Sequence, residues 1–281
     1  MLRQRIITAL VLVALLLPAL FADVAWPFVL LTLLLIAAAG WEWSRLNAGA
    51  GAAALALGAS LAALCAATLA GPWAQQAPRL LWVLTALVWV AGGALALRAG
   101  PASWTRLSRA LRLVLGLMLL WAGWLALVQA RAIGINFILS VLCLVWMADI
   151  AAYFGGRALG RRKLAPSISP GKSWEGVFSG QLGVLVLAAC WLAVENGWGA
   201  GRVDSASLFR VLLDGLGLPL GVLALLALAG MSVVGDLVES LVKRAVGAKD
   251  SSGLLPGHGG VLDRIDALLP VFPLAMAFAT H

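Results

Sequence analysis

The chain has 281 residues, of which 63% are hydrophobic and 11% are charged, and its mean hydropathy is +1.01. Soluble domains carry about 25% charged residues, so this composition excludes one and indicates an integral membrane protein with several spans. The formal net charge is +8, but the basic residues stand in short segments beside apolar runs. We therefore expect no nucleic-acid partner and attribute the charge to membrane orientation and anionic lipid headgroups.

The apolar runs predict an all-α, polytopic integral membrane protein with about nine transmembrane helices. In chain order the predicted spans lie near residues 6–22, 27–43, 50–70, 80–97, 111–129, 135–154, 175–194, 211–235 and 262–280. No clean small-residue cleavage site follows the first run, so we interpret it as an uncleaved helix and not as a signal peptide.

The distribution of Lys and Arg predicts the orientation, because basic loops stay in the cytoplasm. With the N-terminus inside, sixteen of the twenty basic residues fall on the cytoplasmic side, and Arg79, Arg131, Arg202 and Arg210 fall outside. We therefore expect a multi-pass protein of the inner (plasma) membrane whose working face is cytoplasmic.

The chain divides by chemistry into residues 1–130, a set of N-terminal transmembrane helices, and residues 131–281, a C-terminal transmembrane catalytic region. In the first part Glu42 stands between two tryptophans, which predicts interfacial anchoring. Residues 47–71 are almost all Ala, Gly and Leu, which predicts close helix packing. This composition is compatible with a homodimer but identifies no interface.

The three cysteines each fall inside a predicted span and show no CxxC spacing. Neither a zinc site nor a disulfide framework is indicated. We interpret Cys65, Cys143 and Cys190 as packing residues.

The first polar segment runs from Asp149 to Gly176, DIAAYFGGRALGRRKLAPSISPGKSWEG. Asp149 and Tyr153 share a helical face, and Asp149 is either a catalytic group or a structural partner for a following arginine. Lys163, Lys172 and Ser173 supply cationic and hydroxyl donors suited to phosphate. PSISPGKS is not a Walker A loop, because proline replaces its first glycine and no strand precedes it.

The second polar segment gives a more specific prediction than the first, because its spacing indicates which side chains lie close together. Asp236, Glu239, Ser240 and Lys243 form one stripe on an otherwise apolar helix. A loop follows that contains Lys249, Asp250 and the run GLLPGHGG, and then a helix start with Asp263 and Asp266 on one face.

Carboxylates on two helix ends joined by such a turn suit Mg²⁺, which takes oxygen ligands and shares them with substrate phosphates. Asp263 and Asp266 could instead cap the last helix, but their combination with Asp236 favours a metal site. His258 could act as a general base, as a hydrogen-bond donor to a phosphate, or as a group that stabilises the turn by hydrogen bonding. The residues alone indicate a magnesium-dependent, phosphate-handling membrane enzyme.

Beyond this, the stretch from Ser240 to Asp266 resembles the full signature of the phosphatidate cytidylyltransferase (CDP-diacylglycerol synthase) family of bacterial type, and Asp149–Gly176 is similar to its second recognisable segment. The resemblance is strongest over residues 145–281. It implies the reaction of CTP with phosphatidate to give CDP-diacylglycerol and pyrophosphate, with a divalent metal, in phospholipid biosynthesis. In it, a phosphate oxygen of the lipid attacks the α-phosphorus of CTP.

The roles predicted within that resemblance fall into three sets. The predicted metal ligands are Asp236 and Asp263, with Asp149 as a further candidate; Asp250 and Asp266 are additional candidates, as ligands or as partners of the ligands. The predicted catalytic residues are Asp236, Asp263, Lys243, Asp266 and His258. The predicted nucleotide- or lipid-binding residues are Lys172, Ser173, Ser240, Arg244, Lys249, Asp250 and Arg264.

Two alternatives remain, a related enzyme and a protein of another class. A related membrane enzyme could use CTP on a different lipid, although the complete signature argues against it. A transporter for an anionic metabolite would require an internal repeat and a polar pathway through the midplane, whereas the charges here gather at one face.

Overall fold

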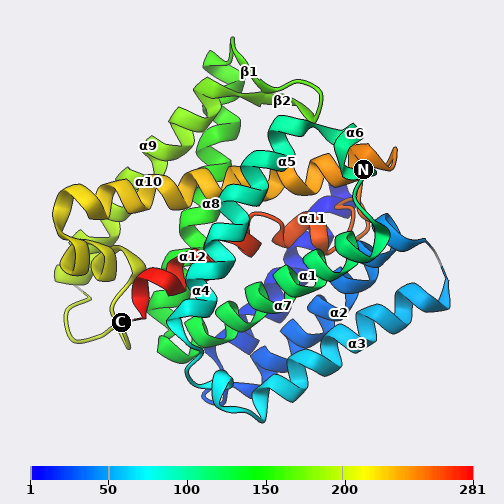
Figure 1. The fold of residues 1–281 in the computed structure, drawn as a ribbon. Helices are drawn as coiled ribbons and strands as arrows, with labels where there is room; N and C mark the ends of the chain where they lie inside the picture. Colours follow the sequence, from blue (N-terminus) through cyan, green and yellow to red (C-terminus); the bar gives the residue numbers. More distant parts are fainter. Residues whose placement is uncertain (1, 50, 198, 281) are drawn as a thin grey trace.

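The structure, a computed structural model, describes residues 2–49, 51–197 and 199–280 and shows helices with one small β-hairpin (Figure 1). The all-α prediction is therefore confirmed. In chain order the elements are α1 (Leu2–Phe21), α2 (Trp26–Ala48), α3 (Ala52–Leu69), the 3₁₀ turn η1 (Pro72–Ala74), α4 (Arg79–Leu87), the π-helical turn η2 (Val88–Gly92), α5 (Gly93–Ala99), α6 (Pro101–Trp104), α7 (Arg109–Ile133), α8 (Ile135–Leu159), β1 (Lys163–Ala165), β2 (Ser169–Ser173), α9 (Trp174–Asn196), α10 (Leu208–Ala245), α11 (Leu262–Ile265) and α12 (Leu268–Ala279).

Seven helices among the described residues are long and apolar enough to cross a membrane, which makes the chain a multi-pass membrane protein. They are Trp26–Asn47, Ala52–Leu69, Arg79–Ala99, Arg109–Ile133, Ile135–Leu159, Trp174–Asn196 and Leu208–Ala245. The predicted count of nine is not confirmed at either end of the chain. The apolar part of α1 is only Leu10–Phe21, and α12 has 12 residues, whereas about 20 are needed to span the hydrocarbon core.

Helix α10 is 38 residues long and is interrupted at Gly217. The φ of Gly217 is 74°, a left-handed conformation that glycine adopts without the steric penalty of a side chain. This break gives α10 a short first arm and a long second arm. The long arm carries the predicted site residues Asp236, Ser240 and Lys243.

The Ala- and Gly-rich region packs closely, as predicted. Helices α2 and α3 lie side by side, and a Cβ added to Gly58 would lie 2.5 Å from the carbonyl oxygen of Ala37. Cys65 is buried in this region, whereas Cys190 is exposed on α9. The packing role is therefore confirmed for Cys65 and wrong for Cys190.

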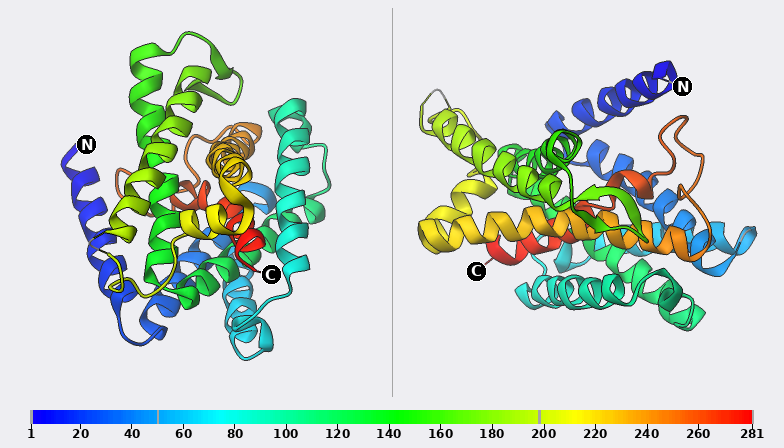
Figure 2. Two further views of the ribbon diagram at one scale, coloured as in Figure 1. Left: turned by 90° about the vertical axis from the view of Figure 1, so that its left-hand side faces the viewer. Right: turned by 90° about the horizontal axis from the view of Figure 1, so that it is seen from above.

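The polar segments gather toward one end of the helix set. In Figure 1 the β1–β2 hairpin, α6 and the C-terminal end of α10 lie toward the top and right, while the C-terminus lies at the lower left. The right-hand view of Figure 2 shows the hairpin beside the long arm of α10. The division into residues 1–130 and 131–281 stays a prediction.

Candidate active site

A cavity of about 530 Å³ lies between α8, β2, α9 and α10 and contains the first group of predicted residues. Its polar lining comes from Asp149, Tyr153 and Arg157 of α8, Ser169, Lys172 and Ser173 of β2, and Asp236 of α10. Lys172 Nζ lies 2.7 Å from Asp236 Oδ2. Residues separated by up to 87 positions thus form one charged, partly exposed cavity.

The β1–β2 hairpin positions Lys172 and Ser173. Ile168, at its turn, is buried, and its carbonyl oxygen accepts a hydrogen bond from Arg244 Nε of α10 at 3.3 Å. At the far end Ser173 is the N-cap of α9, because its Oγ accepts a hydrogen bond from the amide of Gly176 at 3.2 Å. The Ser173 hydroxyl proton is left to donate to a ligand in the cavity.

Glu175 fixes the other strand of the hairpin. Its Oε2 accepts hydrogen bonds from the amides of Arg161 and Arg162 at 3.0 and 3.1 Å, and its Oε1 accepts one from Arg162 Nε at 3.1 Å. The hairpin is therefore bound to both α9 and α10, so Lys172 is presented to the cavity from a fixed backbone.

A second cluster surrounds Lys243, which is buried. Its ammonium group forms ion pairs with Glu239 and Asp263. Asp263 also accepts hydrogen bonds from the amides of Ser251 at 2.9 Å and Gly260 at 2.7 Å and from Ser251 Oγ at 2.7 Å. In this arrangement Asp263 is occupied by protein donors and does not line the cavity.

Asp263 lies on α11, outside the seven spanning helices. Burial acts to raise the pKa of Asp263, but the hydrogen bonds from Lys243, Gly260 and Ser251 outweigh it and lower that pKa to about 2. Asp263 is consequently a carboxylate at neutral pH. Its predicted role as a metal ligand stays a prediction.

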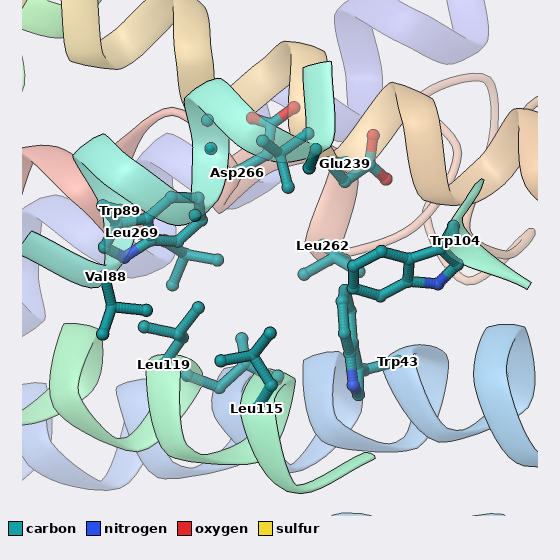
Figure 3. Close-up of a pocket in the computed structure, with 17 residues that line it drawn as sticks. Trp43, Val88, Trp89, Trp104, Leu115, Leu119, Glu239, Leu262, Asp266 and Leu269 are labelled. Carbon is teal, nitrogen blue, oxygen red and sulfur yellow. The ribbon is translucent and has the colours of Figure 1, made fainter. Parts of the chain in front are cut away.

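Asp266 and Glu239 lie above an apolar pocket that is separate from the charged cavity (Figure 3). Trp43, Trp89 and Trp104 form part of its walls. Figure 3 shows the two carboxylates at one side of this pocket. Asp266 Oδ1 accepts a hydrogen bond from the amide of Ala267 at 2.7 Å, which restrains the start of α12.

The loop between α10 and α11 holds the remaining predicted residues. The His258 carbonyl oxygen accepts hydrogen bonds from Arg264 Nε at 3.1 Å and from a terminal Arg264 nitrogen at 2.6 Å, so the backbone of His258 acts as a strut. Within the described residues, the buried Nδ1 of His258 has no hydrogen-bond partner. Lys249 and Asp250 are exposed at the start of the loop. Ser240 lies on α10, before the loop, and its Oγ donates to Asp236 Oδ1 at 3.3 Å.

The prediction for Glu42 is wrong, because its side chain is fully buried and not interfacial. It accepts hydrogen bonds from the amides of Val261 at 3.0 Å and Leu262 at 2.7 Å and from the hydroxyl of Ser252, and Ser251 Oγ lies 3.1 Å from its Oε2. The signal that could have found it is the presence of an ionisable residue inside an apolar helix, which indicates a functional position by default.

The acidic residues fit a magnesium ion that is shared with substrate. No group of three or more His, Cys, Asp or Glu side chains in the described part of the chain forms a ready-made metal site. However, Asp149 and Asp236 line one cavity, and Mg²⁺ is usually held by one or two carboxylates together with waters and substrate phosphates. Two such carboxylates beside Lys172 meet that requirement.

The chain resembles known proteins over its whole length. Residues 3–281 match the model of the cytidylyltransferase family. A phosphatidate cytidylyltransferase of Pseudomonas aeruginosa is 40% identical over 283 residues, which covers 99% of this chain and 96% of the relative.

Other relatives match over about half of their length. A phosphatidate cytidylyltransferase of Haemophilus influenzae is 46% identical over 145 residues, which covers 52% of this chain and 46% of the relative. One of Staphylococcus aureus is 38% identical over 152 residues, which covers 54% of this chain and 52% of the relative. The family match extends over nearly the entire chain, and on this ground the chain belongs to the cytidylyltransferase family.

Proposed function

We propose that the chain is a phosphatidate cytidylyltransferase, an enzyme that converts CTP and phosphatidate into CDP-diacylglycerol and pyrophosphate in phospholipid biosynthesis. A phosphate oxygen of the lipid attacks the α-phosphorus of CTP. The bond from that phosphorus to the oxygen that bridges the α- and β-phosphates breaks, and pyrophosphate leaves. The observation that carries this proposal is the charged cavity of Lys172, Ser173, Asp149 and Asp236 in a membrane protein that resembles such an enzyme over its full length.

The cavity supplies the tasks that this reaction requires. The nucleophile is already anionic, so catalysis needs in-line positioning and charge neutralisation more than covalent chemistry. Lys172 and Ser173 bind phosphate oxygens by donating hydrogen bonds. A phosphate that pairs with Lys172 also releases Asp236 from its present ion pair.

Asp149 and Asp236 would then hold Mg²⁺ against the substrate phosphates. The bound ion would supply positive charge to the phosphate oxygens. Asp263 would join them only after leaving Lys243, Ser251 and Gly260, so we assign it no contact with the ion in the present arrangement.

The two substrates call for a site at the membrane boundary, since one is soluble and the other is an amphiphile. We place this site at the cytoplasmic face of the inner membrane on the basis of the sixteen-to-four distribution of Lys and Arg. A homodimer and the absence of a nucleic-acid partner also stay proposals.

The test is a turnover assay on the purified chain in detergent, with phosphatidate, Mg²⁺ and either CTP, UTP or ATP. Pyrophosphate release and the lipid product are measured together. We expect CDP-diacylglycerol with CTP and Mg²⁺, and a loss of at least about 100-fold in kcat/KM for Asp236→Asn. Asp214→Asn, on the same helix but exposed and outside the cavity, is the matched control and should keep its activity.

The outcomes separate the alternatives. If another lipid gives a cytidylylated product and phosphatidate gives none, the proposed lipid substrate is wrong, whereas the proposed transfer from CTP is kept. A folded protein with no turnover on any nucleotide would refute the enzyme assignment.

A further inference from the structure

Glu42 is a buried carboxylate that belongs to the N-terminal half but contacts the C-terminal site loop. Residues 1–130 contain only two acidic residues, Asp23 and Glu42, and Glu42 has no exposed surface. None of the ion pairs among the described residues involves it. Keeping a carboxylate buried without a cation is costly, so an apolar residue would serve better if packing were its only task.

The carboxylate of Glu42 joins the two ends of the loop formed by residues 251–262. At one end Ser251 Oγ lies 3.1 Å from Oε2, and Ser252 Oγ donates to Oε1. At the other end the amide of Val261 donates to Oε1 at 3.0 Å and that of Leu262 donates to Oε2 at 2.7 Å. Each oxygen is thus in contact with one group from each end of the loop.

The loop packs tightly against this carboxylate, so that a side chain at Gly260 would clash with it. A Cβ added to Gly260 would lie 2.3 Å from Glu42 Oε1 and 2.0 Å from Ser251 Oγ. Helix α2 therefore defines the position of the loop closely, although more than 200 residues of sequence separate them.

Ser251 connects Glu42 to the predicted catalytic residues. Its hydroxyl oxygen lies 3.1 Å from Glu42 and 2.7 Å from Asp263, and its amide also donates to Asp263. A hydroxyl has a single proton, so it can donate to one of the two carboxylates at a time. Asp263 in turn pairs with Lys243. The position of Glu42 is thereby transmitted to Asp263 and Lys243.

We infer that Glu42 is a positioning residue of the reaction, which fixes the loop 251–262 from α2 and so maintains the ion pair between Asp263 and Lys243. The kinetic part of this inference rests on the proposed function, whereas its structural part does not. Since Glu42 and this loop do not line the 530 Å³ cavity proposed to bind the substrates, we expect their disturbance to change kcat more than KM.

The test compares Glu42→Gln with Glu195→Gln in the purified full-length protein. In Glu42→Gln the new side-chain amide would direct an NH₂ group at the backbone N–H of either Val261 or Leu262, whichever way it turns. Glu195 is the control, because it is also buried and accepts hydrogen bonds from Asn136 Nδ2, Ser207 Oγ and the Ser207 amide, but it lies near the opposite helix ends and, unlike Glu42, pairs with a cation, Arg210 Nε at 3.4 Å.

Two quantities are measured per folded molecule: amide hydrogen exchange of residues 251–262, and kcat with KM for CTP. For Glu42→Gln we expect exchange in this loop to be about 10- to 100-fold faster, because charge-assisted bonds are lost. We expect kcat to fall about 100-fold and KM for CTP to change less than about threefold. Glu195→Gln should show neither effect.

Unchanged loop exchange and unchanged kcat in folded Glu42→Gln would overturn the inference. Equal effects in both variants would reduce Glu42 to a general stabilising residue and would also overturn it. If Glu42→Gln does not fold, Ser252→Ala removes one donor and keeps the carboxylate; it should show the same changes at smaller size, and no change would overturn the inference. If wild-type protein makes no CDP-diacylglycerol while loop exchange responds as expected, only the proposed function fails.

Discussion

Lys172 is the residue on which the charged cavity depends most directly. It is held by the hairpin and pairs with Asp236 inside the cavity. For Lys172→Ala we expect kcat/KM for CTP to fall about 100-fold or more, because a phosphate loses its cationic partner and Asp236 remains as an uncompensated negative charge. Steady-state kinetics with varied CTP checks this.

Lys163→Ala is the control for that substitution. Lys163 lies on the neighbouring strand, is exposed and does not line the cavity. Its activity should stay within about threefold of wild type, as for most surface changes. Equal losses for both lysines would instead indicate a diffuse electrostatic effect of the hairpin.

At the residue scale, local spacing identified several residues of the candidate site. It predicted none of the long-range contacts between them. Asp149, Lys172, Ser173 and Asp236 were identified from their segments, and the structure brings these four into one cavity. Spacing also brought Lys243 and Asp263 to attention, but not their pairing with each other, since loop geometry decides it. Glu42 was misread, because its partners lie more than 200 residues away and helical periodicity has no information about them.

At the scale of elements, Gly235 is a position where α10 lies against the start of α12. A Cβ at this position would lie 2.3 Å from the carbonyl oxygen of Asp266 and 3.0 Å from the ring of Pro270. For Gly235→Ala we expect a loss of about 1–3 kcal/mol in the free energy of unfolding, because backbone would have to move. Thermal unfolding in detergent measures it.

Gly230→Ala provides the matched control on the same helix. A Cβ at Gly230 meets nothing within 4 Å. Alanine is favoured over glycine in a helix interior by about 1 kcal/mol, so this variant should be as stable as wild type or more so. A destabilised Gly230→Ala would show that the helix tolerates no added methyl group, and the argument from Gly235 contacts would fail.

Asp204 should make the stability of the α8 start depend on pH. Its carboxylate accepts hydrogen bonds from the amides of Ile135 at 2.6 Å and Asn136 at 3.0 Å. Burial acts to raise the pKa of Asp204, but these amides outweigh it and lower the pKa below its ordinary value. The stabilisation is thus complete above the unfolded pKa near 4 and is lost as pH falls through the lower, folded pKa.

We therefore expect Asp204→Asn to cost about 1 kcal/mol at pH 7, a typical value for a lost helix cap, and the difference from wild type to vanish at acid pH. Unfolding of both proteins between pH 3 and 7 checks this. Asp23→Asn, an exposed change in the loop after α1, is the control and should follow wild type throughout. A difference that grows as pH falls would contradict the sign of the shift.

Hydropathy predicted the positions of the helices and seven of the nine spans, but the first and last predicted spans are not confirmed. Each of the nine predicted runs coincides with helical structure. The last run is divided into α11 and α12 around Asp266, a division that hydropathy cannot detect. Likewise, the kink at Gly217 depends on backbone geometry and leaves the apolar pattern of α10 unbroken.

At the scale of the whole molecule, the proposed orientation can be tested by the accessibility of single cysteines. Lys163 on the hairpin and Val203 in the loop before α10 are both exposed, and the proposed topology puts them on opposite sides. We expect a membrane-impermeant maleimide to label Val203→Cys in intact cells and Lys163→Cys only after the cells are opened. Wild type, whose cysteines all lie in spanning helices, is the control. Labelling of Lys163→Cys in intact cells would reverse the orientation.

The position of Asp236 within α10 bears on which substrate moves during the reaction. Asp236 precedes the end of the helix at Ala245 by nine residues, which corresponds to about 13 Å along the helix axis. Lifting a lipid out of the bilayer would expose its acyl chains to water at about 0.8 kcal/mol for each CH₂ group. A polar nucleotide that descends into a charged cavity avoids this cost. Under the proposed function, the soluble substrate therefore travels to the lipid, and the lipid keeps its place in the bilayer.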